Sequence, residues 1–89
     1  HWSPGGQVRL ELKVKPWLAN HLDESPLSYQ QKLQKQNNGE YLLITNVLDS
    51  IQLRRWLLSY STELEVMQPP ELRDWLGQEL AKAANKYAN

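Results

Sequence analysis

Strict alternation of apolar and charged residues near the start of the chain is the feature that most restricts its fold. Between Gln7 and Lys15, apolar and charged residues take turns in the order Val8, Arg9, Leu10, Glu11, Leu12, Lys13 and Val14. Successive side chains of a β-strand point to opposite faces of a sheet, so the pattern predicts a strand with one buried face. Other elements must cover that face.

The length and the first residues of the chain indicate one small domain. A proline and two glycines discourage regular structure at the start, so residues 1–6 are predicted to be a linker and residues 7–89 a domain. A chain of this size buries only about 60–65% of its unfolded surface, and its core must be small. The first residue is His1 rather than Met, and we expect a fragment of a longer chain.

Two segments after the first strand carry helix and hairpin signals. Pro16 suits the first turn of a helix, and the apolar residues after it predict a short helix that ends before Pro26. A hairpin should follow, because Asn and Gly at 37–39 tolerate the positive φ of a tight turn. Its two strands are expected over residues 29–36 and 40–47.

The second half of the chain should contain a helix, a strand and a final helix. Asp49 with Gln52 resembles a capping box, and an amphipathic helical pattern continues to Tyr60. Residues 63–67 alternate as a short strand, and two prolines then begin the last helix. Gly77 inside that helix is expected to cost about 1 kcal/mol relative to Ala. The helix has an apolar stripe of Leu72, Trp75, Leu76, Leu80, Ala83 and Tyr87.

The expected order of elements, β-α-β-β-α-β-α, predicts an α+β fold. Its first six elements form the βαββαβ sandwich of ferredoxin-like domains, in which the first and third strands are central. An additional C-terminal helix follows. The apolar stripe of this helix must be covered either by the domain's own sheet or by the surface of a partner.

The charge and the composition argue against several functions. Ten basic and ten acidic side chains give a net charge of zero, so the chain lacks the attraction that drives non-specific nucleic-acid binding. It contains no Cys, which rules out disulfides, thiolate metal sites and a cysteine nucleophile. Its apolar runs are far too short to span a membrane, and we expect a cytoplasmic location without membrane contact.

Patterns typical of catalysis or cofactor binding are missing from the sequence. A zinc site would need both His1 and His21 plus carboxylates from elsewhere, and His21 is better interpreted as a polar residue at a helix end. No glycine-rich phosphate-binding motif occurs. RNA recognition is disfavoured because Glu40 stands where a base-stacking strand needs a small or aromatic residue. We therefore expect no enzymatic activity, no metal and no cofactor.

Three arginines and a set of aromatic residues are the candidate contact and core positions. Arg54, Arg55 and Arg73 fall on predicted helices, where a solvated surface is the simplest interpretation. The sharper interpretation is an interdomain or ligand contact, because Arg offers a rigid bidentate fork. We expect them to face such a neighbour rather than to support the fold. Core packing is expected of Trp17, Trp56, Tyr60, Trp75 and Leu76, with Trp56 and Trp75 mostly buried.

Several motifs in the chain are more specific than a fold. Residues 53–60 have the sequence LRRWLLSY, residues 65–73 have EVMQPPELR, and a last helix closes on Tyr87. Weaker motifs lie upstream, in VRLEL at 8–12 and NGEYL at 38–42. Together they resemble the C-terminal extension, called WCX, of bacterial WYL-domain transcriptional regulators.

The chain departs from the family pattern in two places. Ser61 stands where the family commonly has Gly, and the family's Trp-His before Ser is absent from residues 23–30. The Trp-Tyr-Leu motif that names the family is not in this chain, and neither is the family's N-terminal winged helix-turn-helix. The resemblance covers residues 7–87.

The resemblance implies a C-terminal regulatory and dimerisation module of a DNA-binding regulator. Upstream WYL and helix-turn-helix domains of the same chain would receive the signal and bind DNA, while this homodimeric part would not contact DNA directly. An effector would act by favouring one arrangement of the domains over another. The alternative is a stand-alone ferredoxin-like domain, similar to ACT domains, that binds a small molecule.

Overall fold

The computed structural model describes residues 6–88, so the predicted linker lies outside the described residues except for Gly6. The described part of the chain contains four strands and three helices in the predicted order. Their bounds are β1 Gln7–Val14, α1 Pro16–Glu24, β2 Lys32–Lys35, β3 Tyr41–Leu48, α2 Ile51–Ser59, β4 Leu64–Gln68 and α3 Pro70–Asn85.

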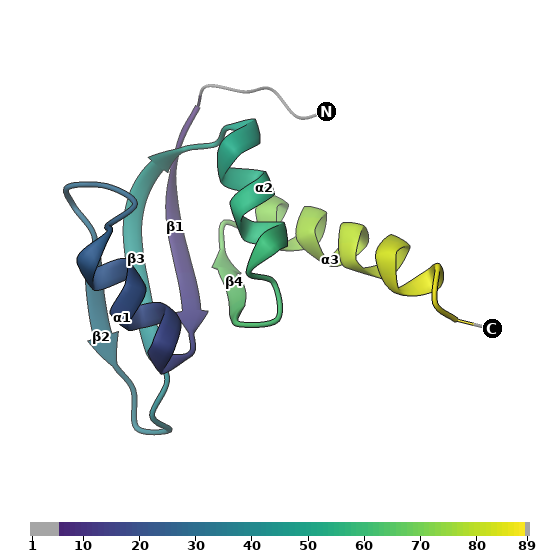
Figure 1. Ribbon diagram of the computed structural model, residues 1–89. Coiled ribbons are helices and arrows are strands. Elements are labelled where there is room, and N and C mark those ends of the chain that lie inside the picture. Colours follow the sequence, from purple (N-terminus) through teal and green to yellow (C-terminus); the bar gives the residue numbers. More distant parts are fainter. Residues whose placement is uncertain (1–5, 89) are drawn as a thin grey trace.

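The strands form one antiparallel sheet in the order β2-β3-β1-β4 (Figure 1). β1 pairs with β3 over its whole length and with β4 on its other side, so β1 and β3 are the central strands. This topology confirms the predicted α+β fold of the ferredoxin-like class with an additional C-terminal helix.

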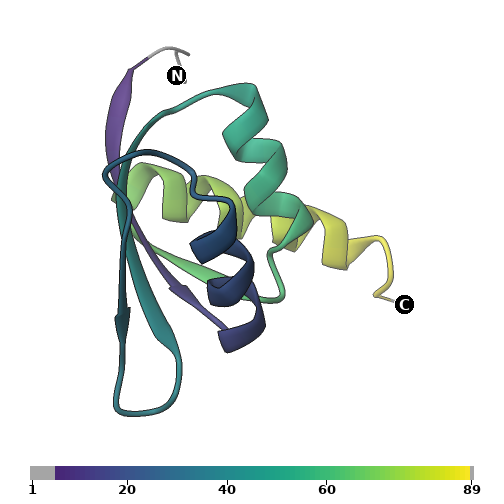
Figure 2. The ribbon, with the colours of Figure 1, turned by 60° about the vertical axis from the view of Figure 1, so that its left-hand side comes forward.

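The core lies between one face of the sheet and the helices. The alternating pattern of β1 is confirmed, because Leu10, Leu12 and Val14 are fully buried while the charged residues between them face away. Figure 2 shows α1 and α2 on the same side of the sheet. The core residues that join these elements are Leu18 and Leu22 of α1, Leu43 of β3, Leu53 and Leu57 of α2, Val66 of β4, and Leu72 and Leu76 of α3.

The connection from α1 to β2 is longer than predicted. The strand expected from residue 29 begins only at Lys32, because the preceding segment is fixed by side-chain hydrogen bonds instead of strand pairing. The side-chain amide of Gln31 donates to the carbonyl of Leu22, and its oxygen accepts from the amide of Leu27. The tight turn after β2 is confirmed, with Gly39 at a φ of 87°.

The capping residue of α2 is not the predicted one. Ser50, not Asp49, is the N-cap, and its hydroxyl oxygen accepts a hydrogen bond from the amide of Leu53 at 3.0 Å. The interpretation of Asp49 and Gln52 as a capping box is therefore wrong. Asp49 stands one residue too early to reach the free amides of the first turn, and its carboxylate binds an arginine instead.

α3 is only half covered by its own domain. Leu72 and Leu76 in its first half are buried and Trp75 is half-buried, whereas Leu80 and Ala83 in its second half are exposed. Tyr87 is also exposed, but it lies beyond the last helical residue, Asn85, and not inside the helix as predicted. Figure 1 shows this second half projecting away from the sheet. The apolar stripe predicted from the sequence is therefore not covered along its whole length by the described residues.

Candidate interaction site

Arg54 is buried, and the expectation that it is an exposed charge is wrong. Only 8% of the residue is exposed. Its Nε and Nη2 atoms donate to the two carboxylate oxygens of Asp49, each at 2.8 Å, in the bidentate geometry that guanidinium and carboxylate groups favour. Its Cζ atom lies 4.6 Å from the centroid of the Trp75 ring. Arg54 therefore ties the start of α2 to α3.

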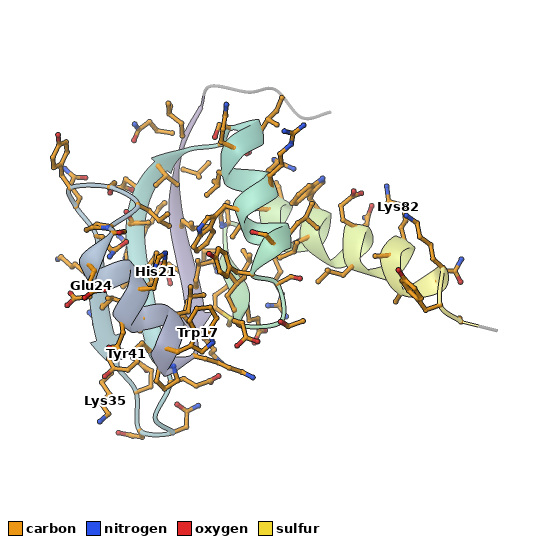
Figure 3. All side chains as sticks on the ribbon, in the orientation of Figure 1. Trp17, His21, Glu24, Lys35, Tyr41 and Lys82 are labelled. Carbon is orange, nitrogen blue, oxygen red and sulfur yellow. The ribbon has the colours of Figure 1, made fainter. Side chains whose placement is uncertain are left out.

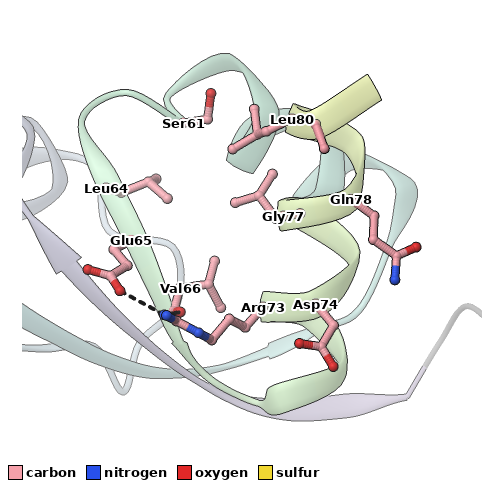
Figure 4. A pocket seen from close by; sticks show the side chains of 11 residues that line it. Ser61, Leu64, Glu65, Val66, Arg73, Asp74, Gly77, Gln78 and Leu80 are labelled. Atoms are coloured by element: carbon pink, nitrogen blue, oxygen red, sulfur yellow. Dashed lines mark hydrogen bonds and ion pairs between the residues drawn. The ribbon is translucent and has the colours of Figure 1, made fainter. Parts of the chain in front are cut away.

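Arg73 also has partners in its own domain, although its side chain is half-exposed. Its Nη1 atom donates to Glu65 Oε2 at 2.7 Å and to the carbonyl oxygen of Val66 at 2.8 Å (Figure 4). The hydrogen bond from Arg73 lowers the pKa of the Glu65 carboxyl below its ordinary value. Because β4 is an edge strand, this contact also occupies part of its free edge.

Arg55 differs from the other two arginines. It is exposed on α2, and no hydrogen bond or ion pair of its side chain is found among residues 6–88. Arg54 of α2 thus contacts α3, and Arg73 of α3 contacts β4. Arg55 faces solvent. Of the three arginines, Arg55 is the one whose charge is available to a ligand or a neighbouring domain.

A groove of about 490 Å³ runs between β4 and α3. Figure 4 shows its strand side with Leu64 and Glu65 and its helix side with Gly77 and Leu80. The groove combines apolar side chains with the Glu65–Arg73 ion pair, and it opens to solvent near the exposed half of α3. A surface of this kind can accommodate a helix or an extended segment of a partner.

Aromatic side chains form a second cluster, between α1 and the end of α2. The Tyr60 ring lies at the centre, with ring centroids of Trp17, His21 and Trp56 at 6.0, 6.5 and 5.1 Å. Figure 3 shows Trp17 and His21 extending from α1. The indole Nε1 of Trp17 donates to Glu63 Oε1 at 2.6 Å, and this bond lowers the pKa of Glu63 below its ordinary value.

The residues expected in the core differ in burial. Leu76 is buried, while Trp56, Tyr60 and Trp75 are half-buried and pack against the core. Trp17 is half exposed, because it reaches across to Glu63 rather than down into the sheet. The expectation that Trp56 and Trp75 are mostly buried is thus met only in part. A two-layer fold this small has few positions at which a whole indole can be enclosed.

The sequence carries no signal for one partner of these residues and only a local signal for another. Glu63 lies 46 positions from Trp17, and only the fold brings their side chains together. Asp49 was assigned to a helix cap, although the arginine five residues later could have been considered as its partner. No group of three or more His, Cys, Asp or Glu side chains in the described part of the chain could hold a metal ion. None of the described helices is long and apolar enough to cross a membrane.

The fold defines a small ferredoxin-like domain. The groove between β4 and α3 and the exposed half of α3 are surfaces that are open to contact with a partner. A comparison with protein families gives a match of the WCX domain to residues 6–84, which is most of the chain. The chain therefore belongs to the WCX family, the C-terminal module of WYL-domain transcriptional regulators, which is generally non-enzymatic. No curated protein and no solved structure matched the chain.

Proposed function

We propose that this domain is the regulatory and dimerisation module of a WYL-type, DNA-binding transcriptional regulator of the bacterial cytoplasm. The observation that carries the proposal is the family match over residues 6–84. In this function the domain contributes to the response to an effector, and upstream WYL and helix-turn-helix domains of the same chain contact DNA.

The exposed half of α3 supports a role in dimerisation. Leu80 and Tyr87 are large apolar residues that remain exposed, and Ala83 lies between them on the same stripe. Leu80 and Ala83 are three positions apart in α3 and therefore share one face of the helix, and Tyr87 follows just beyond the helix end. A second copy of the domain can cover these side chains, with the groove between β4 and α3 next to them.

Sedimentation of the 89-residue chain tests the proposal. The wild type should sediment as a dimer at about 100 µM, an ordinary concentration for a weak small-domain interface. Leu80→Glu should shift the chain to monomer and keep the melting temperature that the wild type has when diluted to monomer, because Leu80 is exposed and its loss removes little from the core.

Asn85→Glu is the matched control, because it adds the same charge to α3 at an exposed position that is off the apolar stripe and outside the groove. It should leave the dimer intact. A wild type that remains monomeric up to millimolar concentration would contradict the role in dimerisation.

A small-molecule-binding domain is the second candidate function. It is supported by a second hollow, which lies beside the first turns of α2 and not between β4 and α3, and which is lined by uncharged residues. The two functions are compatible within one regulator. A stand-alone ligand-binding domain would be favoured if the gene encoded no WYL domain and no helix-turn-helix next to these residues.

A further inference from the structure

A hollow of about 470 Å³ lies where α2 begins. Its lining comes from three parts of the fold: the sheet end at which β1 starts and β3 finishes, the loop after α1, and the first turns of α2. Its size falls in the range of about 300–1,000 Å³ that is typical of small-molecule sites. The hollow is separate from the groove between β4 and α3, and the two share no lining residue.

The inner wall of the hollow is apolar. It is formed by Leu27, Val47, Leu53 and Trp56, which all belong to the core or pack against it. Trp56 is half-buried, so part of its indole remains accessible from the hollow. An accessible indole beside aliphatic side chains provides a stacking and packing surface for a flat ring.

The polar part of the lining is entirely uncharged. Although the chain carries ten basic and ten acidic residues, none of them lines this hollow. The hydroxyls of Ser28 and Ser50 already bond to Thr45 and to the amide of Leu53. Asp49 precedes the helix, but its charge is neutralised by Arg54.

Two primary amides at the rim remain available. No hydrogen bond of the Gln7 or Gln52 side chain is found within the described range 6–88. Each amide carries both a donor and an acceptor, and can therefore form a paired hydrogen bond with another amide-like edge. Both residues are exposed and can turn toward a bound molecule.

We propose that this hollow binds a small uncharged ring compound that carries an amide-like hydrogen-bonding edge. The ring packs against Trp56 and the aliphatic wall, and the edge pairs with the amides of Gln52 and Gln7. A charged ligand is disfavoured, because it would lose hydration without gaining a counter-charge from the lining. The site belongs to the domain itself and does not require the dimer proposed above.

Three probes of the same shape test the chemistry of the site. Benzamide is neutral, benzoate is an anion and benzamidine is a cation, and all three can be titrated into the 89-residue chain by two-dimensional NMR. Benzamide should shift the Trp56 indole and the amides of Asn46 and Gln52 and saturate in the millimolar range, as expected for a ligand of few atoms. Benzoate and benzamidine should bind at least about tenfold more weakly.

Two variants place the interaction on the rim. Gln52→Ala should weaken benzamide several-fold at an unchanged melting temperature, since this side chain is exposed. Gln52→Glu should weaken benzamide and strengthen benzamidine, because it introduces the missing counter-charge. Gln78→Ala, at an exposed glutamine that lines the other groove, is the matched control and should change neither probe.

The proposal is overturned if benzamide causes no saturable shift or shifts residues of the other groove instead. It is also overturned if benzoate binds as tightly as benzamide, which would indicate an anion site at the start of α2. Leu80→Glu, used above against the dimer, should keep full benzamide binding. Failure of the ligand site and failure of dimerisation are therefore measured separately.

Discussion

At the scale of single residues, Arg54 shows that the fold decides whether a charged side chain is buried or exposed. From the sequence, neighbouring Arg54 and Arg55 are equivalent exposed cations, yet in the fold one is buried against Asp49 and Trp75 while the other faces solvent. A buried guanidinium with a bidentate partner stabilises the fold only as a pair. Removal of either member leaves the other charge without compensation.

Arg54→Ala should therefore destabilise the domain by about 3 kcal/mol, the lower end for breaking a buried pair, since the Asp49 side chain keeps some exposure. Arg55→Ala, one position along, should change the free energy of unfolding by no more than about 0.5 kcal/mol. Urea denaturation of both variants measures the difference. Equal effects of the two substitutions would refute the structural role assigned to Arg54.

At the scale of elements, the two halves of α3 have different surroundings. Its first half is fixed by Leu72, Leu76 and the Arg73 contacts with β4, and its second half projects from the domain. Gly77 lies at the junction and lines the groove. Apart from its two chain neighbours and the backbone of its own helix, no atom lies within 4 Å of the position that a Cβ atom on Gly77 would take, so this glycine is not required by a close approach.

Gly77→Ala should accordingly stabilise the domain by about 0.8–1 kcal/mol, because Ala has the higher helix propensity and the added methyl group has room. A thermal melt monitored by circular dichroism checks the sign of the change. A fall in the melting temperature would contradict the prediction.

At the scale of the whole molecule, charges of opposite sign are interleaved on the open face of the sheet. Lys13 of β1 pairs directly across from Glu65 of β4, and Lys32 and Glu11 flank Ile44 on its two sides. The net charge of zero is therefore not the sum of separate basic and acidic patches on this face. Without a basic patch there are few phosphate contacts and little counterion release.

The 89-residue chain should consequently fail to shift a random 20-bp duplex at physiological salt and micromolar protein. A gel-shift titration at two salt concentrations is the measurement. A micromolar complex whose affinity falls steeply with added salt would contradict the assignment of DNA contact to other domains of the regulator.

The sequence alone was sufficient for the order and type of the elements. Alternation in β1, proline at the start of α1 and α3, and the Asn-Gly turn are local signals, and each acts through the backbone of a few neighbouring residues. The family motifs at 53–60 and 65–73 were likewise readable as strings of residues. The ferredoxin-like topology followed from that order, because few arrangements of these elements bury one sheet face.

Only the tertiary structure decided which charges and aromatic rings are enclosed. The Arg54–Asp49–Trp75 contact, the Trp17–Glu63 bond and the uncharged hollow beside α2 each join residues from different elements. Periodicity can assign a residue to a face of its own helix or strand, but it carries no information on how deeply a neighbouring element covers that face. Burial depends on the packing of whole elements, and for this reason one of two adjacent arginines became structural while the other stayed at the surface.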